Sequence, residues 1–316
     1  MDQTTLIINR VLPILFLIGL GYWIRRRQFL AESTIDDLRK IVVNFALPSV
    51  LFLSFLEIKF ELKYFVLFIT LYLLCVGLFG FGVLLQRRLK VEYEYFPYMM
   101  TGFEYGMLGV SLFGSAYGLD QIGYIAVVDL GHELFIWSFF LALLLMKRDG
   151  LTHPGSLVIA VFKSPVMVAI MAGILFNLLG AQGFLYEKVG TGAVIATLRF
   201  LSNLTIPLIL IIVGYGIRLE WRGARKTAVV IAIRLALLIP LALILNEVLI
   251  DGLLNMDSPF QAALFTLLIL PPPFIVPLYM RAGLEDERRY INNVLMLYTV
   301  FTIILFTIYF SFNPTL

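Results

Sequence analysis

The stretch FQAALFTLLILPPPFIVPLYM, residues 260–280, decides the fold. It is apolar over a length that can cross the roughly 30 Å hydrocarbon core of a bilayer. Its centre carries Pro271, Pro272 and Pro273, which remove backbone donors in succession and cannot continue a regular helix. Backbone groups that are freed at membrane depth must face protein or a watery cavity. The stretch therefore predicts a membrane helix that breaks near the middle of the bilayer.

Composition indicates that the rest of the chain also uses lipid as its solvent. Of its 316 residues, 60% are hydrophobic and 14% are charged, and the mean hydropathy is +0.94, whereas soluble domains carry about 25% charged residues. The net charge of +3 is too small to indicate a nucleic-acid partner, and a single cysteine, Cys75, excludes an intramolecular disulfide. We predict an all-α integral membrane protein with ten transmembrane helices, over residues 5–24, 35–56, 64–86, 96–117, 121–146, 157–180, 192–217, 227–250, 259–280 and 290–311.

Lysine and arginine are distributed unevenly between the two sides of these helices. Every odd-numbered gap is basic, and an excess of Lys and Arg is typical of cytoplasmic loops. The basic residues of the odd gaps are Arg25, Arg26, Arg27, Arg39, Lys40, Arg87, Arg88, Lys90, Lys147, Arg148, Lys163, Arg218, Arg222, Arg225, Lys226, Arg281, Arg288 and Arg289. The other side offers Arg10, Lys59, Lys63 and Lys188. The pattern predicts a multi-pass protein of the cytoplasmic membrane with both termini outside.

The two halves of the chain repeat one pattern. The segment NFALP at residues 44–48 has a counterpart in NLTIP at residues 203–207. Two repeats of five helices, at residues 1–150 and 151–316, would be inverted relative to each other, which is the signature of secondary transporters. The same alignment pairs GMLGVS, residues 106–111, with the prolines. Helices four and nine are therefore predicted to break and to point their half-helix ends at one shared site.

Ionisable side chains at membrane depth are costly and functional by default. Glu104 is interpreted either as a proton-coupling group or as a neutral, hydrogen-bonded group that holds the two broken helices together. Asp129, His132 and Glu133 share one helix face. They could relay protons, bind a coupling cation or pair with Arg234, or His132 and Glu133 could simply satisfy each other. Arg234 is expected to pair with Asp129 or Glu133, and a substrate carboxylate is the alternative partner. No metal site is predicted.

The order of motifs along the whole chain resembles the auxin efflux carrier (PIN-like) family of membrane transport proteins. The resemblance lies in Leu12–Arg27, Asn44–Pro48, Gly106–Gly109, Pro165 with Gly173, Asn203–Pro207 with Gly214, Arg234 with Pro240, Pro271–Gly283 and Tyr298–Thr299. It implies a fold like that of bile-acid sodium symporters. Helices 1, 2, 6 and 7 would form a scaffold that is often dimeric. Helices 3–5 and 8–10 would form a mobile, elevator-like transport unit in which the broken helices four and nine cross. It also implies organic-anion substrates.

One departure from the family pattern concerns the crossing itself. Glu104 and Ser111 stand where the family usually has Asn and Pro. An ionised Glu104 would repel a carboxylate. Either Glu104 is protonated when substrate binds, or the substrate is not a simple anion.

These features together predict a secondary active carrier of a small organic acid that works by alternating access, coupled to protons in preference to sodium, without a cofactor. Two alternatives stay open: an uncoupled facilitator or channel on the same fold, and a sodium-coupled carrier of a non-anionic solute. An enzyme is not expected. The predicted substrate contacts are Glu104, Tyr105, Gly106, Gly109, Ser111, Pro271, Pro272, Pro273, Phe274, Asn44 and Asn203, and the predicted coupling residues are Glu104, Asp129, His132, Glu133 and Arg234. Asn44 and Asn203 could instead cap helix bends.

Overall fold

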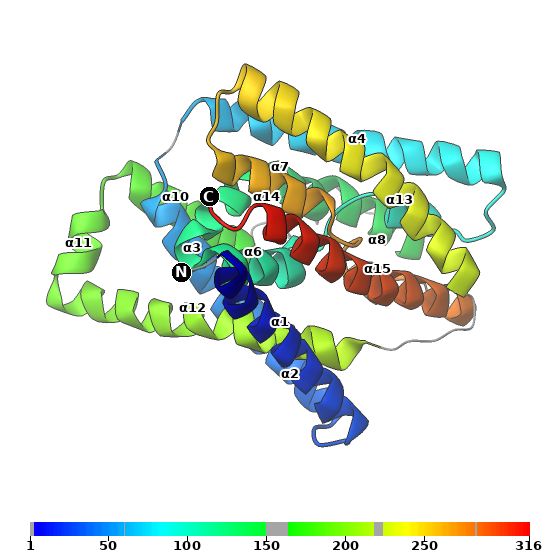
Figure 1. The fold of residues 1–316 in the computed structure, drawn as a ribbon, viewed down its shortest axis with the longest axis horizontal. Helices are drawn as coiled ribbons and strands as arrows, with labels where there is room; N and C mark the ends of the chain where they lie inside the picture. The colour runs from blue at the N-terminus through cyan, green and yellow to red at the C-terminus, as the bar shows by residue number, and fades with distance from the viewer. Residues whose placement is uncertain (1–2, 60, 150–163, 218–223, 282) are drawn as a thin grey trace.

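The computed structural model describes residues 3–59, 61–149, 164–217, 224–281 and 283–316, and it is built from helices (Figure 1). Seven helical stretches of the described residues are long and apolar enough to cross a membrane. They are α1 (Gln3–Arg26), α2–η1–α3 (Glu32–Ile41, Val42–Ala46, Leu47–Glu57), α4 (Lys63–Leu89), η3–α7–η4–α8 (Leu119–Gln121, Ile122–Phe135, Ile136–Phe140, Leu141–Asp149), α12 (Val189–Gly216), α13–η5 (Ala224–Leu245, Asn246–Leu253) and α15 (Glu285–Phe312).

The remaining predicted helices are the fourth, sixth and ninth. In the fourth, α5 (Phe96–Met100) is separated from η2 (Tyr105–Gly109) and α6 (Val110–Tyr117), and in the ninth α14 (Ser258–Leu268) is separated from η6 (Val276–Tyr279). The sixth is the short helix α10 (Pro165–Leu178), followed by α11 (Gln182–Glu187). Its predicted start at residues 157–163 lies outside the described residues, as do Lys163, Arg218 and Arg222. The all-helical membrane architecture is confirmed, and the count of ten stays a prediction.

Glycines allow close backbone contact in two pairs of helices. A Cβ atom added to Gly21 of α1 would lie 2.1 Å from the carbonyl oxygen of Ile211 in α12. A Cβ added to Gly173 of α10 would lie 2.7 Å from the carbonyl oxygen of Phe52 in α3. Only glycine permits such close approach of two backbones. Along α1 and α12 and along α3 and α10, the chains therefore touch backbone to backbone.

These two glycine contacts correspond to each other under the predicted repeat. The Cβ position of Gly21 is flanked by Ile211 and Tyr215, and that of Gly173 by Phe52 and Leu56. The alignment of Asn44–Pro48 with Asn203–Pro207 places Phe52 opposite Ile211 and Leu56 opposite Tyr215. The first helix thus contacts the seventh in the same way as the sixth contacts the second. Two related halves would give such a pair of contacts. The repeat and its inversion stay predictions, which this correspondence supports.

The gaps between helices gather on two faces of the molecule. On one face Lys147 and Arg281 lie 3.5 and 3.3 Å from the carboxylate of Glu94, and the Lys226 ammonium lies 5.4 Å from the Tyr93 ring. On that face Arg25 also donates to the carbonyl of Ile217 at 3.1 Å. Contacts among the first, third, fifth, seventh and ninth gaps therefore bring the basic gaps together.

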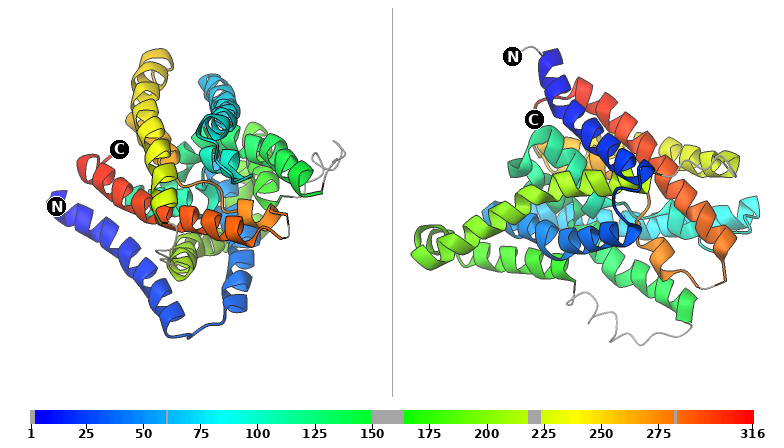
Figure 2. Two further views of the ribbon diagram at one scale, coloured as in Figure 1. Left: turned by 90° about the vertical axis from the view of Figure 1, so that its right-hand side faces the viewer. Right: turned by 90° about the horizontal axis from the view of Figure 1, so that it is seen from below.

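The opposite face holds the even-numbered gaps and both ends of the chain. Arg10 of α1 donates to the carbonyl of Ala116 at 3.0 Å, and the hydroxyl of Tyr117 donates to the carbonyl of Asn313 at 3.0 Å. All three views show the two termini close together (Figures 1 and 2). This arrangement agrees with termini on the side away from the basic gaps. Which side is outside stays a prediction.

Candidate functional site

The fourth helix breaks at residues 101–104, before the glycine pair that was predicted to break it. Thr101 is extended, and Gly102 has a φ of +70°, a conformation that L residues with a Cβ seldom adopt. Gly106 and Gly109 lie in the helical turn η2 that follows. The predicted break is thus corrected by a few residues, because a positive φ at Gly102 ends α5.

The ninth helix breaks where the prolines predict. Helix α14 ends at Leu268, and residues 269–275 pass through Pro271, Pro272 and Pro273 before η6 begins. All three prolines are buried. Their missing N–H groups explain the end of the helix.

The two breaks lie side by side and are hydrogen-bonded to each other through Glu104. The backbone N–H of Glu104 donates to the carbonyl of Pro271 at 2.8 Å. The Glu104 side chain accepts from the backbone N–H of Phe274 at 2.6 Å and from that of Met107 at 3.3 Å. Glu104 is 7% exposed. One buried carboxyl group thus satisfies backbone donors from both broken helices. We call the contact between residues 101–109 and 269–275 the crossing.

Glycines allow this close contact. A Cβ on Gly102 would lie 2.7 Å from Cγ of Pro273, and a Cβ on Gly109 would lie 2.8 Å from Cδ1 of Leu270. Gly106 faces the neighbouring helix α3, where its Cβ would lie 3.2 Å from Cδ2 of Leu47. The glycines of the fourth helix therefore fit the crossing against the ninth helix on one side and against α3 on the other.

Arg234 of α13 binds backbone carbonyls at the ends of both half-helices. Its guanidinium donates to the carbonyl of Met99 at 3.0 Å, to that of Gly102, and to that of Leu270 at 3.4 Å. It is fully buried and lies 5.1 Å from the Phe103 ring centroid. The prediction that Arg234 pairs with Asp129 or Glu133 is wrong. The partners of Arg234 are instead carbonyls that the breaks leave without helical partners. A cation at a helix C-terminus offsets the partial negative charge of that terminus.

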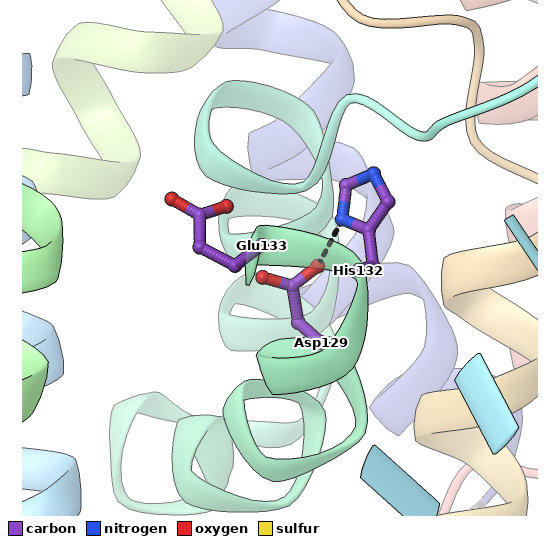
Figure 3. A group of neighbouring side chains, drawn as sticks. All are labelled: Asp129, His132 and Glu133. Atoms are coloured by element: carbon purple, nitrogen blue, oxygen red, sulfur yellow. Dashed lines mark hydrogen bonds and ion pairs between the residues drawn. The ribbon is translucent and has the colours of Figure 1, made fainter. Parts of the chain in front are cut away.

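The polar face of α7 is also tied to the crossing. His132 Nδ1 lies 2.7 Å from Oδ1 of Asp129, and the two side chains turn toward each other (Figure 3). His132 Nε2 accepts the backbone N–H of Phe103 at 2.9 Å. Because Nε2 accepts, the ring proton lies on Nδ1 and is donated to Asp129. His132 thus supports the extended segment between α5 and η2.

Glu133 points away from the imidazole in Figure 3 and accepts the indole N–H of Trp137 at 2.7 Å. The expectation that His132 and Glu133 satisfy each other is therefore wrong, because Asp129 is the partner of His132. One potential ligand atom from each of Asp129, His132 and Glu133 lies within 4.8 Å of the others. Both nitrogens of His132 are already hydrogen-bonded, however, so this arrangement suits a hydrogen-bonded network better than a set of free metal ligands.

The other predicted contacts divide between the crossing and the periphery. Tyr105 is 2% exposed, and its hydroxyl makes no hydrogen bond within the described part of the chain. Ser111 is buried and donates to the carbonyl of Met107 in its own helix at 2.8 Å. Phe274 is half-buried beside the prolines. Asn44 is exposed and donates to the carbonyl of Lys40 at 2.7 Å, four residues earlier in the same continuous helix.

Asn203 lies instead in the wall of a cavity of about 770 Å³ on the face of the even-numbered gaps. Helices α3 and α12 line it on one side, and Tyr64, Tyr124 and Phe260 line it on the other. On α3 its lining residues run from Val50 to Glu57, and Leu47, one helical turn before Val50, faces Gly106 of the crossing. The cavity wall and the contact at Gly106 are thus parts of one helix, α3.

Over residues 6–313 the sequence matches the family described as "Membrane transport protein". The chain belongs to the membrane transport protein family. A relative in Methanothermobacter thermautotrophicus, described as an uncharacterized transporter, is 26% identical over 261 residues, which cover 80% of this chain and 76% of the relative.

As a membrane transport protein, the chain is a multi-pass transporter and not an enzyme. Such a protein handles a small-molecule substrate in a lipid environment. The predicted resemblance to the auxin efflux carriers is confirmed at the level of this family.

Sequence reasoning did not identify every residue that builds the transporter's crossing. It missed Gly102, whose positive φ makes the break, and Phe103, whose ring lies beside Arg234 and whose N–H is bound by His132. The available signal was a glycine two residues before a glutamate in an apolar stretch. Gly106 and Gly109 were interpreted as the site of the break, but they lie in the helical turn that follows it.

Proposed function

We propose that this membrane transport protein is a secondary active carrier that moves a small organic solute across the cytoplasmic membrane by alternating access. The resemblance implies a small organic acid as that solute. The observation that carries the proposal is the meeting of the two broken helices at Glu104, whose backbone and side chain bind Pro271 and Phe274. Broken helices that meet near mid-membrane are where secondary transporters bind substrate and coupling ions.

Glu104 is the proposed coupling group. It is buried, and each of its carboxylate oxygens accepts a backbone N–H from one of the broken helices. Gain or loss of a proton there changes how strongly the two breaks are held together, because charge-assisted hydrogen bonds are stronger than neutral ones. Protons are favoured over sodium, since Asp129, His132 and Glu133 form hydrogen bonds to protein groups.

The glycine-locked helices support a division into scaffold and moving unit. Helices α1, α3, α10 and α12 are the proposed scaffold, and close backbone contacts hold α1 to α12 and α10 to α3. The crossing meets this scaffold through the Leu47 side chain at Gly106. Side-chain contacts can slide where interlocked backbones cannot. Association of two scaffolds in a homodimer is part of the proposal.

Uptake into proteoliposomes tests the proposal. The purified protein is expected to accumulate its solute when a pH gradient is imposed, and the Glu104→Gln variant is expected to retain counterflow while losing the dependence of accumulation on pH. A Glu247→Gln variant, changed at an exposed glutamate in η5, serves as the control. Counterflow without accumulation in the wild type would indicate an uncoupled facilitator. A pH profile that Glu104→Gln leaves unchanged would remove Glu104 from coupling.

A further inference from the structure

The backbone donors at the crossing that a substrate carboxylate would use are already occupied. Met107 and Phe274 present N–H groups that the breaks leave without helical partners, and both are bound by the Glu104 carboxyl group at 3.3 and 2.6 Å. A second carboxylate at this place would have to displace the first one. It would also bring like charges close together in a medium of low dielectric constant, where repulsion is strong.

We propose that the substrate of this carrier is a small organic cation that bears an ammonium group, and that Glu104 takes the position that the carboxylate of an anionic substrate would occupy. This inference rests on the proposed carrier function and changes its substrate class from an organic acid to an amine.

The charges around the crossing favour a cation. Glu104, Asp129 and Glu133 are buried carboxyl groups, and Arg234 is the one buried guanidinium among the described residues of the crossing. Arg234 directs its donors to the carbonyls of Met99, Gly102 and Leu270. His132 is neutral, because its Nε2 accepts the N–H of Phe103. Buried carboxyl groups therefore outnumber the one buried guanidinium here, and an ammonium group beside Glu104 would stabilise its ionised form.

The polar groups that are free to bind also suit an ammonium donor. The hydroxyl of Tyr105 is buried, and no described group hydrogen-bonds to it. Its ring lies 3.3 Å from the Cβ position of Gly109, within the crossing. A phenol oxygen accepts hydrogen bonds, and an ammonium group is a donor. The half-buried ring of Phe274 next to Glu104 offers a face for a cation–π contact.

The cavity on the face of the even-numbered gaps carries a surplus of one negative charge. Its lining holds four carboxylates and three cationic side chains, which are Glu57, Glu61, Asp120, Asp257, Lys59, Lys63 and Arg199. Lys63 lies 3.0 Å from Glu61, and Arg199 lies 4.0 Å from Glu57, so these two pairs cancel and leave Asp120 and Asp257 against Lys59. A cleft with an acidic surplus concentrates cations and repels anions.

Thermal-shift measurements on the purified full-length protein at neutral pH test the inference with two probes of equal carbon number, 1,3-diaminopropane and malonate. At about 10 mM, a probe with a Kd near 1 mM is expected to raise the Tm by roughly 3 °C. The diamine is expected to give this shift with the wild type and malonate is not. In Glu104→Gln the diamine shift should shrink and malonate should gain one. Glu247→Gln should behave as the wild type.

The wild-type comparison decides the matter even if Glu104→Gln does not fold. A malonate shift that equals or exceeds the diamine shift overturns the inference, and so does the absence of any diamine shift. Transport of malonate by proteoliposomes would then leave the carrier function intact. Conversely, diamine binding without flux of any solute would overturn the carrier function and leave the ligand class standing.

Discussion

At the scale of single residues, a few side chains decide whether the crossing can form. Glu104 binds a backbone donor from each broken helix, and Arg234 binds backbone acceptors from each. Together the two residues satisfy the N–H and C=O groups that have lost their helical partners inside a membrane. Gly102 supplies the backbone conformation that both arrangements need.

Replacing Gly102 is expected to destabilise the protein. In Gly102→Ala the residue keeps a φ of +70° and its Cβ meets Cγ of Pro273 at 2.7 Å. The left-handed conformation alone costs about 1–2 kcal/mol, and the Tm in detergent should fall by roughly 5 °C or more. Gly80→Ala is the matched control, because nothing lies within 4 Å of its Cβ position in α4. Equal Tm values for the two variants would contradict this account.

Replacing Arg234 should leave buried carbonyls without donors. We expect Arg234→Met to lower the free energy of unfolding by about 3 kcal/mol, since each unsatisfied buried acceptor costs about 1–3 kcal/mol. Arg199→Met is the comparison: its side chain is 60% exposed and 4.0 Å from Glu57, and exposed pairs contribute about 0–1 kcal/mol. Thermal unfolding followed by intrinsic fluorescence measures both. A stable Arg234→Met protein would show that these bonds matter little.

At the scale of helices, the sequence predicts interruptions more surely than it locates them. Pro271–Pro273 lack the backbone N–H groups that a helix needs, so the break in the ninth helix lies at the prolines themselves. Glycine permits a break without forcing one, so Gly106 and Gly109 could be helical while Gly102 was not. The partner of Arg234 was missed for a related reason. A sequence does not show which backbone carbonyls lack helical partners, whereas it does show the carboxyl groups of Asp129 and Glu133.

The contact between α1 and α12 offers a prediction at this scale. Gly21→Ala places a methyl group 2.1 Å from the carbonyl oxygen of Ile211 and should force the two helices apart. We expect a Tm loss of roughly 5 °C, from overpacking of about 1–3 kcal/mol. Gly19→Ala, in the same helix with nothing within 4 Å of the added atom, should keep or slightly raise the Tm. A larger loss for Gly19→Ala would refute the assigned contact.

At the scale of the whole molecule, the basic gaps meet around Glu94 and Tyr93, and the other gaps meet around the 770 Å³ cavity. Counting Lys and Arg along the chain predicted this separation. The count could not predict the cavity, because Asn203 and Asp257 come from segments that the fold alone brings together.

Cysteine labelling in intact cells tests which face is outside. The native Cys75 is 0% exposed, so it should not react with a membrane-impermeant maleimide. Glu61→Cys, in the cavity wall, is expected to be labelled from outside. Glu92→Cys, exposed in the basic third gap, should be labelled only after the cells are permeabilised. The reverse pattern would invert the predicted topology.

The bond from Arg234 to Met99 has a consequence for biogenesis. The two residues lie 135 positions apart in the chain, and synthesis proceeds at about 5–20 residues per second. The fourth helix therefore leaves the ribosome roughly 7 to 27 seconds before its guanidinium partner does. During that interval the open carbonyls of Met99 and Gly102 must be shielded by the translocon or by water. The first half of the chain consequently cannot complete its own folding until the eighth helix has been inserted.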